Sequence, residues 1–153
     1  MKIREILKKY PLLKYIFFFL FFSFAGFLLE FFFGIIRGKS SIPYDQTLYQ
    51  IFGIKSVFIP FYGEGALVLI LFEKFLDRKK IKFFLRGFLD GLIIIAWELT
   101  GGALAILLLN ERFWDYSNHP FNFFGIISLN MSIIWIFVGY LFSFIYRKII
   151  KKL

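Results

Sequence analysis

The sequence contains no cysteine and a single histidine, and these shortages exclude several classes of site. Without thiols the chain can form neither a disulfide bond nor a thiolate metal site. One imidazole, His119, makes no histidine cluster, and no Ser-His-Asp order or metal-ligand spacing accompanies it. No G-x-x-x-x-G-K-[ST] stretch is present either, so an ATP-driven activity requires a separate nucleotide-binding subunit. We therefore predict no metal, no cofactor and no catalytic residue.

Apolar residues are abundant instead. Of 153 residues, 59% are hydrophobic and 24% are aromatic, and the mean hydropathy is +0.74. This is one domain's length, and it is too apolar for an ordinary soluble domain. The net charge of +9 comes from basic residues at the edges of apolar runs, where anionic lipid headgroups lie. The charge thus indicates a lipid bilayer as the partner rather than a nucleic acid.

Four apolar runs predict an all-α fold, a bundle of four transmembrane helices over residues 15–36, 57–76, 87–109 and 122–146. The run 87–109 is long enough, because its residues cover about 34 Å as a helix and the hydrocarbon core is roughly 30 Å thick. We expect a single domain, 15–146, between a basic interfacial segment, 1–14, and a basic tail, 147–153.

Basic residues predict the orientation of this bundle. Nearly all Lys and Arg residues lie in 1–14, 74–86 and 147–153, and the exceptions are Arg37, Lys39, Lys55 and Arg112. By the positive-inside rule, both termini are cytoplasmic in a multi-pass protein of the bacterial plasma membrane. Ser23-Phe24-Ala25 also resembles a signal-peptide cleavage site, but the apolar run continues well past Ala25.

Acidic residues inside the apolar runs predict a polar interior. An acid at the centre of a membrane helix costs on the order of 2.5–3.5 kcal/mol, so it needs a partner, a proton or water. We predict a polar cavity or ligand site that includes Glu30, Tyr62, Glu64, Trp97 and Glu98. Asp90 is predicted to be structural, near the inner interface, with Arg86 or Lys82 as its partner.

The second run leaves two interpretations open. Residues 59–66, IPFYGEGA, interrupt the apolar pattern with Pro60, two glycines and Glu64. This composition favours an irregular or broken helix that lines the interior. Alternatively, Pro60 only starts the helix and Glu64 lies at the headgroup level.

Small residues and an aromatic loop complete the pattern. Small side chains at helical spacing let neighbouring helices approach closely. We predict packing positions at Gly26, Gly63, Gly65, Gly101, Gly125, Ser128 and Ser132. The loop 110–121 with the residue that follows it is turn-rich and aromatic, and it provides the outer-loop motif Trp114, Asp115, Tyr116, Ser117 and Asn122.

These motifs resemble a known family. SFAGFLLE (23–30), PFYGEGA (60–66), WELTGG (97–102) and FWDYSNHPFNFFGIISL (113–129), with Trp135, resemble the putative type IV ABC-transporter permease family, small bacterial membrane proteins that are similar to the vertebrate transmembrane protein 229 group. The resemblance implies a polytopic transporter component. The chain departs from the family pattern at Ile126, Ile127 and Ser128, where an Arg and a Cys are common, and at Glu64, where an apolar residue is common.

Three functions fit these observations. The first is a membrane transport component (permease) with an acidic cavity, which acts as a homodimer or with other membrane or ATPase subunits. The second is a non-catalytic accessory or sensor protein, whose acids only fix helix packing. The third, less favoured, is an intramembrane enzyme that uses Glu30 and Glu98 as a carboxylate pair with His119 as an acid or base.

Overall fold

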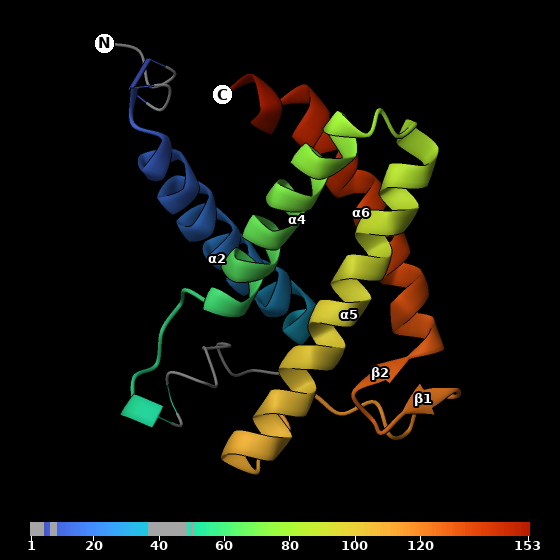
Figure 1. The fold of residues 1–153 in the computed structure, drawn as a ribbon. Coiled ribbons are helices and arrows are strands. Elements are labelled where there is room, and N and C mark those ends of the chain that lie inside the picture. Colours follow the sequence, from blue (N-terminus) through green and yellow to red (C-terminus); the bar gives the residue numbers. More distant parts are fainter. Residues whose placement is uncertain (1–4, 7–8, 37–48, 50) are drawn as a thin grey trace. The chain divides into compact units, whose positions relative to one another are not determined.

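The computed structural model describes residues 5–6, 9–36, 49 and 51–153. Its long elements are the helices α2 (Pro11–Ile36), α4 (Pro60–Arg78), α5 (Phe83–Leu109) and α6 (Leu129–Lys148) (Figure 1). An antiparallel hairpin, β1 (Asn122–Phe123) and β2 (Ile127–Ser128), precedes α6, and a 3₁₀ helix, η1 (Ile150–Lys152), follows it. The prediction of a mainly helical chain is confirmed. The predicted interfacial segment, 1–14, lies partly outside the described residues.

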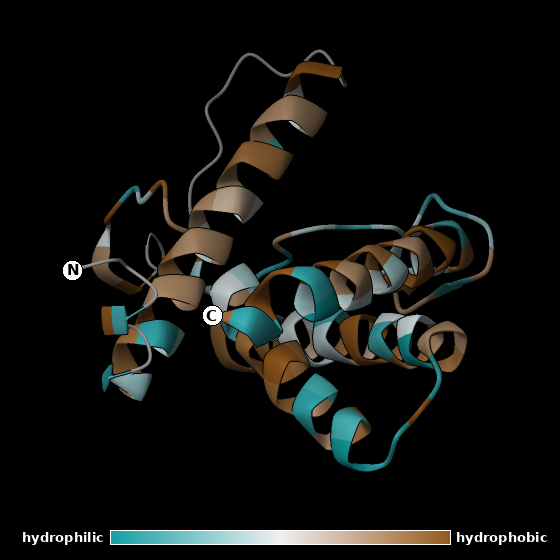
Figure 2. Cartoon of the chain, turned by 90° about the horizontal axis from the view of Figure 1, so that it is seen from above, coloured by the Kyte–Doolittle hydropathy of each residue, from teal (hydrophilic) through white to brown (hydrophobic). Residues whose placement is uncertain are grey.

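Within the described residues, three helices are long and apolar enough to cross a membrane: α2, α5 and the stretch Leu129–Lys152. The 26 residues of α2 and the 27 of α5 each cover about 40 Å. Large apolar side chains on these helices are exposed, as a lipid-facing surface requires; Phe84 is 78% exposed and Phe137 is 70% exposed. Hydrophilic residues lie mainly at the helix ends and in the connecting loops (Figure 2).

The helix α4 differs from these three because it is more highly charged. Its 19 residues include Glu64, Glu73, Lys74, Asp77 and Arg78, so it is not among the candidate membrane spans. A fourth membrane crossing at 57–76 therefore stays a prediction, and so does the cytoplasmic location of both termini.

The start of α4 tests the prediction of a broken helix in the IPFYGEGA stretch. α4 begins at Pro60 and continues without interruption to Arg78, so the prediction of a broken helix is wrong. The physical reason is that proline fits the first turn of a helix, where a backbone N–H has no intrahelical acceptor to lose. Gly63 inside the helix is tolerated because its lack of a side chain permits close packing against α2.

The predicted final span, 122–146, is wrong at its beginning. Residues 122–128 form the hairpin, and α6 begins only at Leu129. Phe124 and Gly125 have positive φ angles of 52° and 68°, which no right-handed helix accommodates. Ser128 then caps α6, because its side chain accepts a hydrogen bond from the backbone N–H of Met131 (3.5 Å).

The chain forms two compact units, residues 1–67 with Leu153 and residues 68–152. In the first unit, small residues bring α2 and the start of α4 into contact. A Cβ atom at Gly26 would overlap the side chain of Tyr62, and one at Gly63 would overlap the hydroxyl group of Ser23. The backbone N–H of Ile59 also donates a hydrogen bond to the carbonyl of Ser23 (3.2 Å). Gly26 and Gly63 thus lie at close helix contacts.

In the second unit, α5 and α6 lie side by side along their lengths (Figure 1). Glycines form the closest part of this contact. A Cβ atom at Gly139 of α6 would lie 2.5 Å from the carbonyl oxygen of Gly87 and 2.7 Å from the Cα atom of Gly91, both on α5. The two backbones therefore approach each other with no room for a side chain. This close contact of the two helices allows Trp135 of α6 to reach Glu98 of α5.

Candidate functional site

Glu98 lies on α5, inside one of the candidate membrane spans, and its side chain is buried, with 5% of the residue exposed. One carboxylate oxygen, Oε1, accepts a hydrogen bond from the Tyr116 hydroxyl (3.0 Å), and the other, Oε2, accepts one from the Trp135 indole N–H (2.7 Å). The two donors come from the loop after α5 and from α6. Both are neutral, so neither compensates a negative charge on Glu98.

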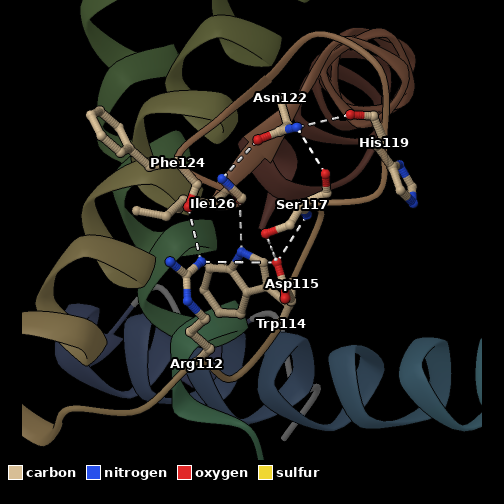
Figure 3. A network of polar contacts seen from close by, with 9 residues as sticks. Arg112, Trp114, Asp115, Ser117, His119, Asn122, Phe124 and Ile126 are labelled. Atoms are coloured by element: carbon tan, nitrogen blue, oxygen red, sulfur yellow. Dashed lines mark hydrogen bonds and ion pairs between the residues drawn. The ribbon is translucent and has the colours of Figure 1, made fainter.

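Tyr116 reaches Glu98 because the loop between α5 and α6 has a defined fold. The side-chain amide of Asn122 donates hydrogen bonds to the carbonyl oxygens of Ser117 (3.1 Å) and His119 (2.9 Å). Its oxygen accepts a third hydrogen bond from the backbone N–H of Gly125 (3.0 Å), as Figure 3 shows. The backbone N–H of Tyr116 in turn donates to the carbonyl of Gly125 (2.8 Å). Asn122 thus holds the loop in its folded conformation.

Asp115 organises the first turn of the same loop. It accepts hydrogen bonds from the backbone N–H of Ser117 (2.9 Å) and from the Ser117 hydroxyl (2.5 Å), which together lower the pKa of Asp115 below its usual value. The Arg112 guanidinium lies 3.9 Å from the same carboxylate oxygen and donates to the carbonyl of Phe124 (2.9 Å) (Figure 3). Asp115 is therefore an anion whose carboxylate fixes the backbone of its own loop.

Trp114 fixes the loop to the helix below it. Its indole N–H donates to the carbonyl of Ile126 (2.9 Å), and its ring lies 3.1 Å from where a Cβ atom on Gly102 would be. Gly125 has a φ of +68°, and an added Cβ atom would meet Ser117 and Asp115 at 2.5 and 2.7 Å. This position requires glycine, both for the backbone angle and for the space.

His119 lies in this loop near α6. Its Nδ1 atom is 3.4 Å from the Ser128 hydroxyl, and its ring centroid is 5.3 Å from that of Tyr116. Its backbone N–H donates to the carbonyl of Tyr116 (2.8 Å). His119 is therefore a turn residue that packs against other residues of the loop.

We expect Asn122→Ala to lower the free energy of unfolding by about 1–2 kcal/mol, because three hydrogen bonds within the loop are lost. Thermal unfolding of the detergent-purified protein would measure this loss. Asn118→Ala, at an exposed position of the same loop, is the matched control and should change stability by less than about 0.5 kcal/mol. Equal effects of the two variants would contradict the role given to Asn122.

The other predicted site residues have different environments. In the first unit, the Tyr62 hydroxyl donates to Oε1 of Glu30 (2.6 Å) at an exposed position, and Glu64 is also exposed. Trp97, Gly65, Gly101 and Ser132 are half-buried, whereas Ser128 is buried. The structure thus brings Glu30 together with Tyr62, and Glu98 with Tyr116. A single cavity that includes Glu30, Glu64 and Glu98 stays a prediction.

Trp135 was not predicted as a site residue, although its signal was present. It lies on α6 at helical spacing from Ser128, Ser132 and Gly139, the small residues of the packing side. A large amphipathic side chain on such a side has its N–H directed into the bundle, where it needs an acceptor. That argument, applied to Trp135, would have paired it with an acid.

A second polar cluster lies around Arg86, about 18 Å along α5 from Glu98. Arg86 is 3% exposed, and its guanidinium contacts Oε2 of Glu73 (3.2 Å) and Oδ1 of Asp77 (2.6 Å). Lys151 of η1 contacts the other oxygen of Asp77 (2.7 Å), and the Ser143 hydroxyl donates to Oε1 of Glu73 (2.5 Å). Although burial acts to raise it, hydrogen bonds from Lys151 and Arg86 hold the pKa of Asp77 below its usual value.

Sequence reasoning missed most of this cluster. Glu73 lies near the end of the predicted span 57–76 and was not predicted as a site residue, although Glu73 with Asp77 and Arg86 with Asp90 each follow the i, i+4 spacing of one helix face. The predicted pairing of Asp90 with Arg86 is wrong. Within the described residues Asp90 makes no ion pair, because Arg86 contacts Glu73 and Asp77 instead.

The sequence also matches a known protein family. A family model described as Putative ABC-transporter type IV matches residues 17–153, which include the Glu98 site, the loop and the Arg86 cluster. No solved structure matches the chain. The match and the three apolar helices together indicate a membrane protein. The chain belongs to the family of Putative ABC-transporter type IV proteins, as the resemblance of its motifs predicted.

Proposed function

We propose that the protein is the membrane-embedded component of a transporter and that Glu98 is the group that binds its solute. The observation that supports this most is the burial of Glu98, at 5% exposure, inside an apolar helix with neutral donors on its two oxygens. An acid in such a place attracts a positive charge, because neither of these donors supplies one. The proposed solute is therefore a cation, a proton or a cationic metabolite.

The loop provides a way to open this site. Tyr116 is the loop side chain that is hydrogen-bonded to Glu98, and the hydrogen bonds of Asn122 and Asp115 hold the loop in place. Movement of the loop exchanges the Tyr116 hydroxyl for the solute while Trp135 keeps its hydrogen bond to the other oxygen. We propose that this exchange gates access to Glu98 from the outer side of a four-helix, multi-pass protein of the bacterial plasma membrane.

Energy for transport has to come from elsewhere in this proposal. The sequence contains no phosphate-binding loop, so ATP hydrolysis requires a separate ATPase subunit. Even with a fourth crossing added to the three apolar helices of the described residues, the pathway within one chain is narrow, and a second copy or another membrane subunit would complete it. The basic ends of the chain fit anionic lipid headgroups on the cytoplasmic side.

We expect a ligand to raise the melting temperature of the wild-type protein and not that of Glu98→Gln. The measurement is thermal unfolding in detergent over a range of pH and a panel of inorganic cations and small cationic metabolites. A ligand at about 100 times its Kd stabilises the native state by about 2.7 kcal/mol. Glu111→Gln, an exposed glutamate of the loop, is the matched control and should keep the full response.

The second candidate is a non-catalytic accessory or sensor protein. The two hydrogen bonds of Glu98 favour it, because an acid that only holds the loop and α6 against α5 would make the same bonds. A glutamine side chain has only one acceptor oxygen and would keep at most one of these bonds. Glu98→Gln should therefore lower stability by about 1–3 kcal/mol under either proposal. The ligand response distinguishes the two. If no ligand stabilises the wild type and Glu98→Gln is destabilised at every pH, Glu98 is a packing element and the transport proposal fails.

A further inference from the structure

The cluster around Arg86, in which Glu73, Arg86 and Asp90 are buried, has more acidic groups than basic ones. Its three carboxyl groups are Glu73 and Asp77 on α4 and Asp90 on α5, and its two cations are Arg86 and Lys151. If every group were ionised, the cluster would carry one uncompensated negative charge. Burial of an uncompensated charge is strongly unfavourable. One of the three carboxyl groups therefore has to lose its negative charge or bind an additional cation.

Asp90 is the carboxyl group that lacks a partner. It is 0% exposed, and within the described structure neither of its oxygens accepts a hydrogen bond. Its charged neighbours are Glu73, which is also 0% exposed, and Arg86. The terminal nitrogens of Arg86 are already bound to Glu73 (3.2 Å) and Asp77 (2.6 Å). A buried carboxylate beside a second carboxylate, without any donor, persists only if it binds a proton or a cation.

The polar side chains that α6 and η1 contribute to the cluster are bound to other acids. On α6, the Ser143 hydroxyl donates to Glu73 (2.5 Å), and the Tyr146 side chain is buried near Asp77 and Glu73. On η1, Lys151 contacts Asp77 (2.7 Å). Each of these groups acts on an acid of α4, so none of them compensates Asp90.

We propose that Asp90 and Glu73 form a proton-binding site, in which one proton on an Asp90 oxygen is hydrogen-bonded to the Glu73 carboxylate. With this proton bound, the charges of Glu73 and Asp77 are balanced by those of Arg86 and Lys151, and the cluster is neutral. A proton needs only the two carboxyl groups, whereas a metal cation needs several oxygen ligands around it. The site uses residues other than Glu98, so it is independent of the transport proposal.

Loss of this proton has a structural consequence. The Asp90 carboxylate then competes with Asp77 and Glu73 for the Arg86 guanidinium. Arg86 holds the C-terminal part of α4 to α5 through those two acids, so deprotonation weakens this contact. The site thus couples proton release to a change in the contact between α4 and α5.

Infrared spectroscopy of the full chain in lipid vesicles tests the proposal directly. Aspartate labelled with heavy carbon at its side-chain carboxyl shifts the carbonyl band of any protonated aspartic acid, which separates it from bands of glutamic acids such as Glu98. We expect one such band at neutral pH in the wild type, which Asp90→Asn abolishes. The control is Asp115→Asn, at an exposed and ionised aspartate, which should leave the band unchanged.

Glu73→Gln provides a second test that does not depend on the folding of Asp90→Asn. This variant removes one negative charge, so Asp90, Asp77, Arg86 and Lys151 balance without a proton, and the band at neutral pH should be lost. Absence of the band in the wild type, or its persistence in Asp90→Asn, would overturn the proposal. Loss of the band when sodium or potassium is added at constant pH would show a metal cation in the site and would also overturn it.

Discussion

Arg86→Met should lower the free energy of unfolding by about 3–5 kcal/mol, the largest loss we expect from any single substitution in the chain. Removal of the guanidinium leaves Glu73 buried at 0% exposure without its cation and takes one of the two cations from Asp77. Methionine fills a similar volume, so lost packing contributes little. Unfolding of the detergent-purified protein by heat or by a denaturing detergent would measure the change.

Lys151→Met is the matched control, because Lys151 contacts the same carboxylate of Asp77 but its side chain is 53% exposed. An exposed ion pair contributes only about 0–1 kcal/mol, so this variant should be close to the wild type. Arg86→Lys should be intermediate, since an ammonium group cannot reach two acids with the fork of a guanidinium. Similar small losses in Arg86→Met and Lys151→Met would show that burial does not strengthen this ion pair.

Gly139→Val should lower the free energy of unfolding by about 3 kcal/mol and loosen the contact between α5 and α6. An added Cβ atom would meet backbone atoms of Gly87 and Gly91 at 2.5 and 2.7 Å, and backbone atoms cannot rotate away as a flexible side chain can. The helices have to separate. Trp135 lies one turn before Gly139 on α6, so its hydrogen bond to Glu98 should lengthen as well.

Thermal unfolding measures the stability change, and the fluorescence of the tryptophans reports the altered environment of Trp135. Phe137→Val is the matched control, because it places the same β-branched residue two positions away on a side chain that is 70% exposed. It should leave both readings near those of the wild type. A loss in Phe137→Val as large as in Gly139→Val would show that the helix propensity of valine, not the helix contact, is responsible.

The environment of Glu98 could be predicted only in part from the sequence. Glu98 was predicted because an acid in an apolar helix is costly, and Tyr116 because it belongs to a distinctive loop motif. That these two residues contact each other was not predictable, since they are separated by 18 positions and belong to different elements. The position of Trp135 on the packing side of α6 did indicate a buried acceptor for its indole N–H, but the sequence does not say that this acceptor is Glu98, 37 positions away.

The cluster around Arg86 was not predicted, for a different reason. Glu73 stands next to Lys74 in a charged segment, and such a segment usually lies in water, so nothing in its immediate neighbourhood indicates burial. Its burial follows from Arg86 and Ser143, which are 13 and 70 positions away. The hairpin before α6 was also missed, because its apolar side chains match a membrane helix in composition while Asn122 and Gly125 set the turn.

The sequence by itself determined that this chain has apolar helices of membrane length and that their acids need polar partners, because hydropathy and length are properties of a continuous segment. Only the tertiary structure decided which partners they have. Glu98 received two neutral donors, Glu73 received Arg86 and Ser143, and Asp90 received none. The physical reason is that a hydrogen bond depends on a few tenths of an ångström, and this precision comes from the close contact of helices at Gly87, Gly91 and Gly139.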